Sequence, residues 1–126
     1  MREIKFRFFD TTLKEMFSQN QIEDYTLEQI NRFSSTDDQY TKVMQFTGCI
    51  NKQDIEIYEG DIVEDSPSHK YLNGEYIRGV VVFRYYKFAV SYTHPDGKVF
   101  YDELDSSFRV VGNIHQHAHL LENKWN

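Results

Sequence analysis

The chain of 126 residues contains one cysteine, Cys49, and two prolines. A lone cysteine excludes an internal disulfide and is typical of a reducing compartment. No apolar run reaches the roughly 18 residues of a membrane-spanning helix, and charged residues follow Met1 where a secretory signal would be apolar. We therefore expect a cytoplasmic protein with no membrane partner.

Charge of one sign is in excess, because 20 acidic residues face 14 basic ones and give a formal net charge of −6. This charge disfavours non-specific binding to phosphate backbones and anionic lipid. Six acids and no base occur in residues 54–65, whereas residues 76–95 contain bases and no acid. The acidic run lacks the spacing of a calcium loop, so we interpret it as the solvated outer face of strands.

Alternating apolar residues predict strands over most of the chain. In "IKFRFF" the pattern places Ile4, Phe6 and Phe8 on one face, and Lys5 and Arg7 on the other. A second strand at "EMF" completes an N-terminal hairpin. Residues 18–38 are polar and are either a short helix or a strand and loop. Strand character resumes at "YTKVMQF", is interrupted by "TGCINKQD", and returns in "IEIYEGDIV".

The run "RGVVVFRYYKFAVSY" is too long for one ordinary strand. A two-residue turn at Tyr85–Tyr86 would pair Phe83 with Phe88, Val81 with Val90 and Gly79 with Tyr92, which makes a consistent apolar ladder. Two observations oppose it: Tyr-Tyr is a poor turn pair, and Arg84 would face Lys87. "HPDGK" is a cleaner turn into "KVFYDEL", "SSFRVVGNI" predicts a last strand, and "HLLENKW" predicts one helical turn.

Many short strands separated by turns predict a mainly β fold built around a small barrel, with at most one or two short helices. We expect a β-rich N-terminal subdomain over residues 1–47, with the polar insert near 18–38. Residues 48–126 would form the barrel and a short tail. The two parts are expected to fold as one unit.

Three blocks of the sequence resemble the YopX family of phage and prophage proteins. They are "IKFRFFD…EM", "VMQFTGCINKQDIEIYEGDIV", and "GVVVF" followed by "VVGNI…LL". The chain departs from the family pattern at Tyr85–Tyr86, where the family has an Asn-Gly or Asp-Gly turn. It also departs in the tail "NIHQHAHLL" and in the segment between Phe17 and Tyr40.

The resemblance implies a strand-rich fold in which "YEGDIV" leads into a Src-homology-3-like barrel, and a homo-oligomer in the cytoplasm of a bacterial host. It implies no catalytic activity and no cofactor. The motif residues are expected to be structural, covering the core, turning the chain and starting the first barrel strand: Ile57, Tyr58, Gly60, Asp61, Ile62, Val63, Gly112 and Asn113.

Two chemical hypotheses have simpler interpretations. On a strand, His115, His117 and His119 would face one way and could bind a metal, but the strand is expected to end at Ile114, so an exposed polar tail is favoured. Cys49 has no neighbouring residues that would activate a thiolate, so a partly buried apolar role is favoured over a nucleophile.

The best functional candidate is the basic, aromatic stretch, with the residues Arg78, Arg84, Tyr85, Tyr86, Lys87 and Tyr92. Paired cations beside exposed rings suit a contact with another subunit, or with a phage or host protein. They also suit a single-stranded nucleic acid. The net charge ranks the protein interface first and nucleic acid second. A MazF-like ribonuclease, suggested by "GDIV", ranks last because the motif lies mid-chain in an acidic block.

Overall fold

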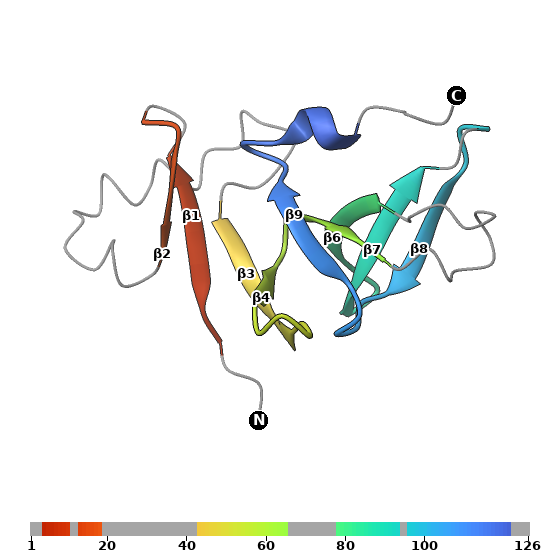
Figure 1. The fold of residues 1–126 in the computed structure, drawn as a ribbon, viewed down its shortest axis with the longest axis horizontal. Coiled ribbons are helices and arrows are strands. Elements are labelled where there is room, and N and C mark those ends of the chain that lie inside the picture. Colours follow the sequence, from red (N-terminus) through yellow and green to blue (C-terminus); the bar gives the residue numbers. More distant parts are fainter. Residues whose placement is uncertain (1–3, 11–12, 19–42, 66–77, 94–95, 122–126) are drawn as a thin grey trace.

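The computed structural model describes residues 4–10, 13–18, 43–65, 78–93 and 96–121, which form two antiparallel sheets side by side (Figure 1). The first sheet has the order β2-β1-β3-β4, with β1 Phe6–Asp10, β2 Glu15–Ser18, β3 Val43–Ile50 and β4 Glu56–Tyr58. The second has the order β8-β7-β6-β5-β9, with β5 Asp61–Glu64, β6 Arg78–Arg84, β7 Lys87–Thr93, β8 Val99–Glu103 and β9 Arg109–Asn113.

The predicted mainly β class is confirmed, and the second sheet curves into a half-barrel. Within the described residues the helical structure is one 3-10 turn, Ala118–Leu121, at the predicted helical turn of the tail. None of the described helical structure is long and apolar enough to cross a membrane. The helix considered for residues 18–38 lies outside the described residues.

The interruption predicted at "TGCINKQD" is present but begins later than predicted, because β3 continues through Gly48 to Ile50 and the turn occupies residues 51–55. A shift in its pairing with β4 and a positive φ of 86° at Gly48 absorb the glycine as a bulge within the strand. The predicted subdomain boundary between residues 47 and 48 falls inside this strand, and the division into two subdomains stays a prediction.

The motif "YEGDIV" makes the turn that passes the chain from the first sheet to the second, as predicted. Gly60 has a φ of 87°, and a Cβ there would lie 2.9 Å from the Met44 sulfur, so the position requires glycine. Asp61 closes the turn, because its Oδ2 accepts a hydrogen bond from the Tyr58 N–H at 2.8 Å. Ile62 and Val63 then enter β5 fully buried.

The buried apolar side chains of the described residues form three clusters. The half-barrel core consists of Ile57, Val63, Val81, Val90 and Phe108. On the first sheet one cluster consists of Phe9, Met44, Phe46 and Tyr58, and a smaller one is built around Phe8. Because Ile57 and Tyr58 are neighbours on β4 and belong to different clusters, this short strand connects the two sheets.

The predicted orientation of β1 is wrong in part, because the face carrying Arg7 is covered. Phe8 packs with Phe6 and Phe17 on one side of the strand. Phe9, on the Arg7 side, lies in the other cluster. Ile4, predicted on the buried face, is 69% exposed. Alternation reveals which residues share a face, but it does not reveal how many faces are covered.

An ion pair between Arg7 on β1 and Asp61 on β5 joins the two sheets. Asp61 is 1% exposed and the Arg7 side chain 18% exposed. The guanidinium also lies over the Tyr58 ring, 4.7 Å from its centre. Burial raises the pKa of Asp61 above its ordinary value, although Arg7 and the Tyr58 N–H oppose the shift.

We predict that Arg7→Met lowers the free energy of unfolding by about 3 kcal/mol, because the variant leaves a buried carboxylate without its cation. Lys5→Met is the matched control, since Lys5 pairs with the more exposed Glu56, and it should cost less than about 1 kcal/mol. Urea denaturation measures both. Equal losses in the two variants would show that the Arg7–Asp61 pair has no special role.

Candidate protein interface at the β6–β7 hairpin

The hairpin predicted from the apolar ladder is present. Val81 pairs with Val90, Phe83 with Phe88, and Arg84 with Lys87. Tyr85 and Tyr86 are the two turn residues, with φ values of 51° and 66°. Two central residues with positive φ define a type I′ turn, whose backbone twist matches that of the flanking strands.

This turn conformation is unfavourable for tyrosine. A type I′ turn prefers Asn-Gly, because a Cβ in the left-handed region costs about 1–2 kcal/mol per residue. The strands on either side impose the conformation through their buried ladder. The rings therefore occupy the tip despite the local backbone preference, and that is the kind of strain found at functional positions.

The tip presents its two rings to solvent, with Tyr85 75% and Tyr86 96% exposed. Beside them the Arg84 guanidinium lies between two rings, 4.6 Å from the centre of Tyr85 and 3.9 Å from that of Tyr101 on β8. Arg84 also donates a hydrogen bond to the Tyr85 hydroxyl at 3.1 Å. These contacts hold the cation and one ring in a fixed arrangement.

The like charges of Arg84 and Lys87, which argued against the hairpin, have separate partners. Lys87 Nζ lies 3.4 Å from Glu103 on β8, while Arg84 contacts the two tyrosine rings. On the other face of the hairpin Phe83 is 52% exposed and meets Phe88 edge to face at 5.0 Å. Phe88 packs against the half-barrel core, and this contact anchors the start of β7 next to the tip.

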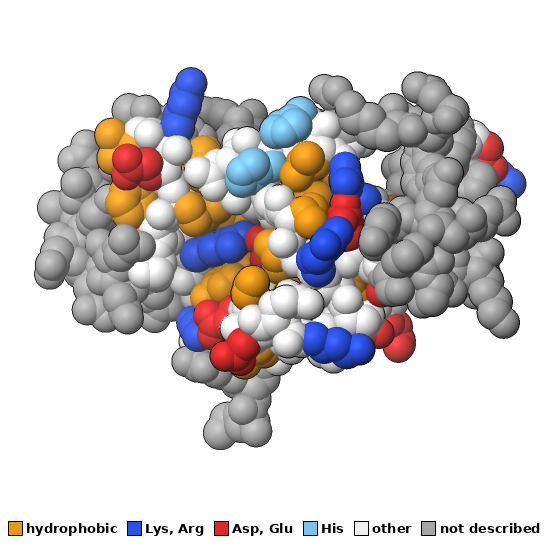
Figure 2. All heavy atoms as spheres, in the orientation of Figure 1, with side chains coloured by type: hydrophobic (Ala, Val, Ile, Leu, Met, Phe, Trp, Pro, Cys, Tyr) orange, Lys and Arg blue, Asp and Glu red, His pale blue; other side chains and the backbone are white. Residues whose placement is uncertain are grey.

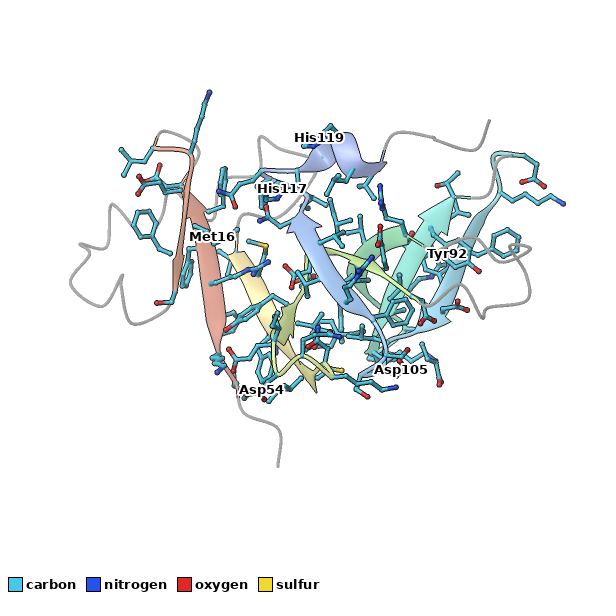
Figure 3. All side chains as sticks on the ribbon, viewed as in Figure 1. Met16, Asp54, Tyr92, Asp105, His117 and His119 are labelled. Atoms are coloured by element: carbon cyan, nitrogen blue, oxygen red, sulfur yellow. The ribbon has the colours of Figure 1, made fainter. Side chains whose placement is uncertain are left out.

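Two predicted interface residues lie away from this tip. Tyr92 on β7 is only 8% exposed and its ring stacks on Phe100 at 5.7 Å (Figure 3). Arg78 is at the opposite end of β6, where it pairs with Glu64 and donates a hydrogen bond to the Leu120 carbonyl. The structure therefore brings together Arg84, Tyr85, Tyr86 and Lys87 but not all six candidates.

The acidic run 54–65 is not a uniformly solvated face, contrary to the sequence interpretation. Glu64 is 4% exposed and accepts hydrogen bonds from Arg78 Nε at 2.8 Å and Arg109 at 2.6 Å. Burial alone would raise the pKa of Glu64, but the two guanidinium groups outweigh it and lower the pKa. Asp61 is buried as well, whereas Asp54 is exposed.

Comparisons with known proteins identify the family. The model of the family described as YopX protein matches residues 5–122. The chain belongs to the YopX family. The fold is similar to the crystal structure of protein EF1440 from Enterococcus faecalis, with a TM-score of 0.53 and 24% identity over 97% of this chain and 100% of that one. None of the curated proteins matches.

The residues of "GNI" have a structural role at the end of β9. Asn113 Oδ1 accepts hydrogen bonds from the N–H groups of His115 and Gln116, both at 3.0 Å. Its own N–H donates to His117 Nδ1 at 3.1 Å. A Cβ at Gly112 would lie 2.8 Å from the His117 ring, so this close approach requires glycine.

The three histidines of this YopX-family chain do not converge. His115 stacks on Phe9 at 4.9 Å, while His117 and His119 lie at the 3-10 turn with ring centres 6.4 Å apart (Figure 3). Within the described part of the chain no three or more His, Cys, Asp or Glu residues are placed to bind a metal. Cys49 is partly buried, and this burial is the main cause that raises the pKa of its thiol. The negative charge of nearby Asp105 raises the pKa further. A raised pKa disfavours a nucleophilic role.

Sequence reasoning did not find Tyr101 and Glu103, the β8 residues beside the hairpin tip. The turn at Gly97 predicted that β8 follows β7, but not which β8 residues meet Arg84 and Lys87. That requires the register of β7 on β8, in which Ser91 faces Tyr101 and Ala89 faces Glu103. The aromatic residues on the strand after this turn were the sequence feature that could have pointed to Tyr101.

We predict that Glu64→Gln loses about 2 kcal/mol of unfolding free energy at neutral pH, because two charged hydrogen bonds are weakened. The lowered pKa of Glu64 stabilises the fold above the unfolded-state pKa, and this contribution disappears as the pH falls through the folded-state value. The difference from the natural protein should therefore shrink from about pH 7 to about pH 3.

The control for this prediction is Glu103→Gln, which alters the solvent-exposed pair with Lys87. It should change the unfolding free energy by less than about 1 kcal/mol at every pH. Denaturant titrations across the pH range measure both variants. A constant difference between Glu64→Gln and the natural protein would contradict the assigned role of Glu64.

Proposed function

We propose that this YopX-family protein is a non-catalytic accessory protein of a phage or prophage, a self-assembling module that binds a protein through the β6–β7 hairpin tip. One observation carries the proposal: Tyr85 and Tyr86 hold an unfavourable left-handed turn with their rings 75% and 96% exposed. Neither ring contributes to a core cluster of the described residues. Exposed tyrosines beside an arginine are typical anchors of protein interfaces.

The charges around the tip favour a protein partner over a nucleic acid. Glu103 accompanies Lys87, and Arg84 is stacked on tyrosine rings, so the cations here are not a continuous track for phosphates. Figure 2 shows the same mixture on the face it presents, where Lys and Arg lie beside Asp and Glu. The net charge of −6 acts in the same direction.

The non-catalytic part of the proposal is supported by the position of "GDIV". A ribonuclease of the MazF type would need this motif beside a basic substrate surface. Here Asp61, Ile62 and Val63 are at most 1% exposed and serve the turn and the half-barrel core. The resemblance to such toxins therefore extends only to the chain's entry into a small barrel.

We predict that the double variant Tyr85→Asn, Tyr86→Gly folds with an unfolding free energy higher by about 1 kcal/mol, because Asn-Gly relieves the left-handed backbone. Thermal and urea unfolding measure the gain. The control is Tyr85→Phe, Tyr86→Phe, which keeps both rings and should lower stability by less than about 1 kcal/mol, because only the exposed hydrogen bond from Arg84 to the Tyr85 hydroxyl is lost. Stability lost in the Asn-Gly variant would mean that the rings themselves hold the fold together, and the functional argument would fail.

The proposal itself is tested by photo-crosslinking in bacterial cells that carry the phage. A photoreactive phenylalanine derivative at position 86 should give a discrete adduct with a protein after illumination. The same derivative at Leu13, a turn residue before β2 that is 56% exposed, is the matched control and should give none. Equal, diffuse labelling from both positions would refute a specific contact at the tip.

Single-stranded nucleic acid is the second candidate partner, because the Tyr86 ring is 96% exposed and lies beside the cations of Arg84 and Lys87 in the sequence. Bases stack on such aromatic and guanidinium surfaces with about 1–3 kcal/mol each. The same crosslinking experiment separates the two candidates. An adduct that nuclease treatment removes indicates nucleic acid, whereas an adduct that only protease removes indicates a protein.

A further inference from the structure

Arg84 differs from the other arginines that the structure describes. Each of those others forms an ion pair with a carboxylate that is at most 4% exposed, and they are Arg7, Arg78 and Arg109. Within the described part of the chain Arg84 has no carboxylate partner, and it contacts two tyrosine rings and a tyrosine hydroxyl instead. A chain with more acids than bases thus holds one arginine at its surface without an acid.

The contacts of Arg84 position its guanidinium and leave hydrogen-bond donors available. The group lies 3.9 Å from the centre of the Tyr101 ring, which is the spacing of two stacked planes. A stacked guanidinium directs its N–H groups sideways, along the plane of the ring, and arginine has five such donors. The Tyr85 hydroxyl accepts a hydrogen bond from Nη2. The other donors can bind a carboxylate at two points when it approaches from solvent.

An apolar surface adjoins this cation on the same face of the half-barrel sheet. The registers of β6 on β7 and of β7 on β8 place four side chains on that face: Arg84, Lys87, Tyr101 and Glu103. Val99 alternates with Tyr101 along β8 and joins them, and these two β8 residues are 51% and 43% exposed. The complement of this surface is a carboxylate with apolar side chains beside it.

The charges on this face suit a single carboxylate better than a row of phosphates. Lys87 lies 3.4 Å from Glu103, whose side chain is 84% exposed, so phosphates that follow one another past Arg84 would meet a negative charge. The guanidinium also covers one face of the Tyr101 ring, and a base cannot stack on that face at the same time. An acidic segment of a protein avoids both conflicts.

We propose that the hairpin tip binds an acidic segment of another protein, in which a carboxylate pairs with Arg84 and a neighbouring apolar side chain contacts Tyr86. This inference rests on the proposed function and names the chemistry of its partner. An ion pair left in solvent contributes little. Here the Tyr86 ring, 96% exposed in the free protein, would exclude water from the pair once the partner covers it. Because tyrosine contacts already hold Arg84 in place, binding costs less conformational entropy.

Substitution of Arg84 in the cross-linking experiment tests the inference. With the photoreactive derivative at position 86, Arg84→Gln should lower the yield of the protein adduct at least about tenfold, because the carboxylate loses its cation. Arg84→Lys keeps the charge without the planar fork and should give an intermediate yield. The matched control is Lys14→Gln, which removes one positive charge from the exposed turn before β2 and should leave the yield unchanged. Equal yields from Arg84→Gln and Lys14→Gln overturn the inference.

Mass spectrometry of the adduct tests the chemistry of the partner without any change at Arg84. The cross-linked peptide should contain Asp or Glu within about three residues of the attachment point, since an extended chain advances about 3.3 Å per residue. Replacing that acid by arginine in the partner should abolish the adduct, and Arg84→Glu should restore it. A peptide without such an acid, an adduct removed by nuclease, or an adduct between two copies of this chain overturns the inference.

Failure of this inference and failure of the proposed function give different results. A protein adduct at position 86 that forms equally well in Arg84→Gln refutes the acidic partner and leaves the tip as a protein-binding surface. The absence of a discrete adduct in the natural background refutes the contact at the tip, and the inference falls with it. Loss of the adduct in Arg84→Gln, together with an acid in the cross-linked peptide, supports both.

Discussion

The buried carboxylate of Asp61 is the constraint on which the two-sheet arrangement depends. One oxygen accepts the Tyr58 N–H and fixes the turn between β4 and β5. The other accepts the guanidinium of Arg7, 54 residues earlier in the chain. Because a carboxylate is expensive to bury, both partners must be present together. The turn and the packing of the first sheet on the second are therefore coupled through one side chain.

The sequence predicts local features of this fold well. Alternation and turn residues indicate the N-terminal hairpin, the entry through Gly60, the turn at Gly97 and the strand ending at Asn113. The turn at Tyr85–Tyr86 is the instructive case. Its residues argue against it, whereas the ladder that pairs Phe83 with Phe88 predicts it. Cross-strand pairing over several residues outweighed the unfavourable turn conformation of the two tyrosines.

Burial of the acids could not be predicted, because it depends on residues distant in sequence. Glu64 is stabilised by Arg109, 45 residues later, and alternation contains no information about that distance. The same limit applies to the candidate interface. The tip residues 84–87 are contiguous and were found, whereas Tyr101 and Glu103 reach the tip only through the register of another strand. The three histidines do not face one way, because Asn113 accepts hydrogen bonds from the His115 and Gln116 N–H groups and so turns the chain as it leaves β9.

The pairing of β5 with β9 has a consequence for synthesis of the protein. β5 lies at the middle of the chain, yet its neighbour β9 spans Arg109–Asn113, and Ile62 pairs with Gly112. Contacts of such long sequence separation form slowly, because the intervening chain must first be ordered. A ribosome must therefore synthesise β9 before the half-barrel can acquire its last strand. Until then the nascent chain leaves one edge of β5 without its neighbour, and an unpaired strand edge is a site at which incompletely folded chains associate.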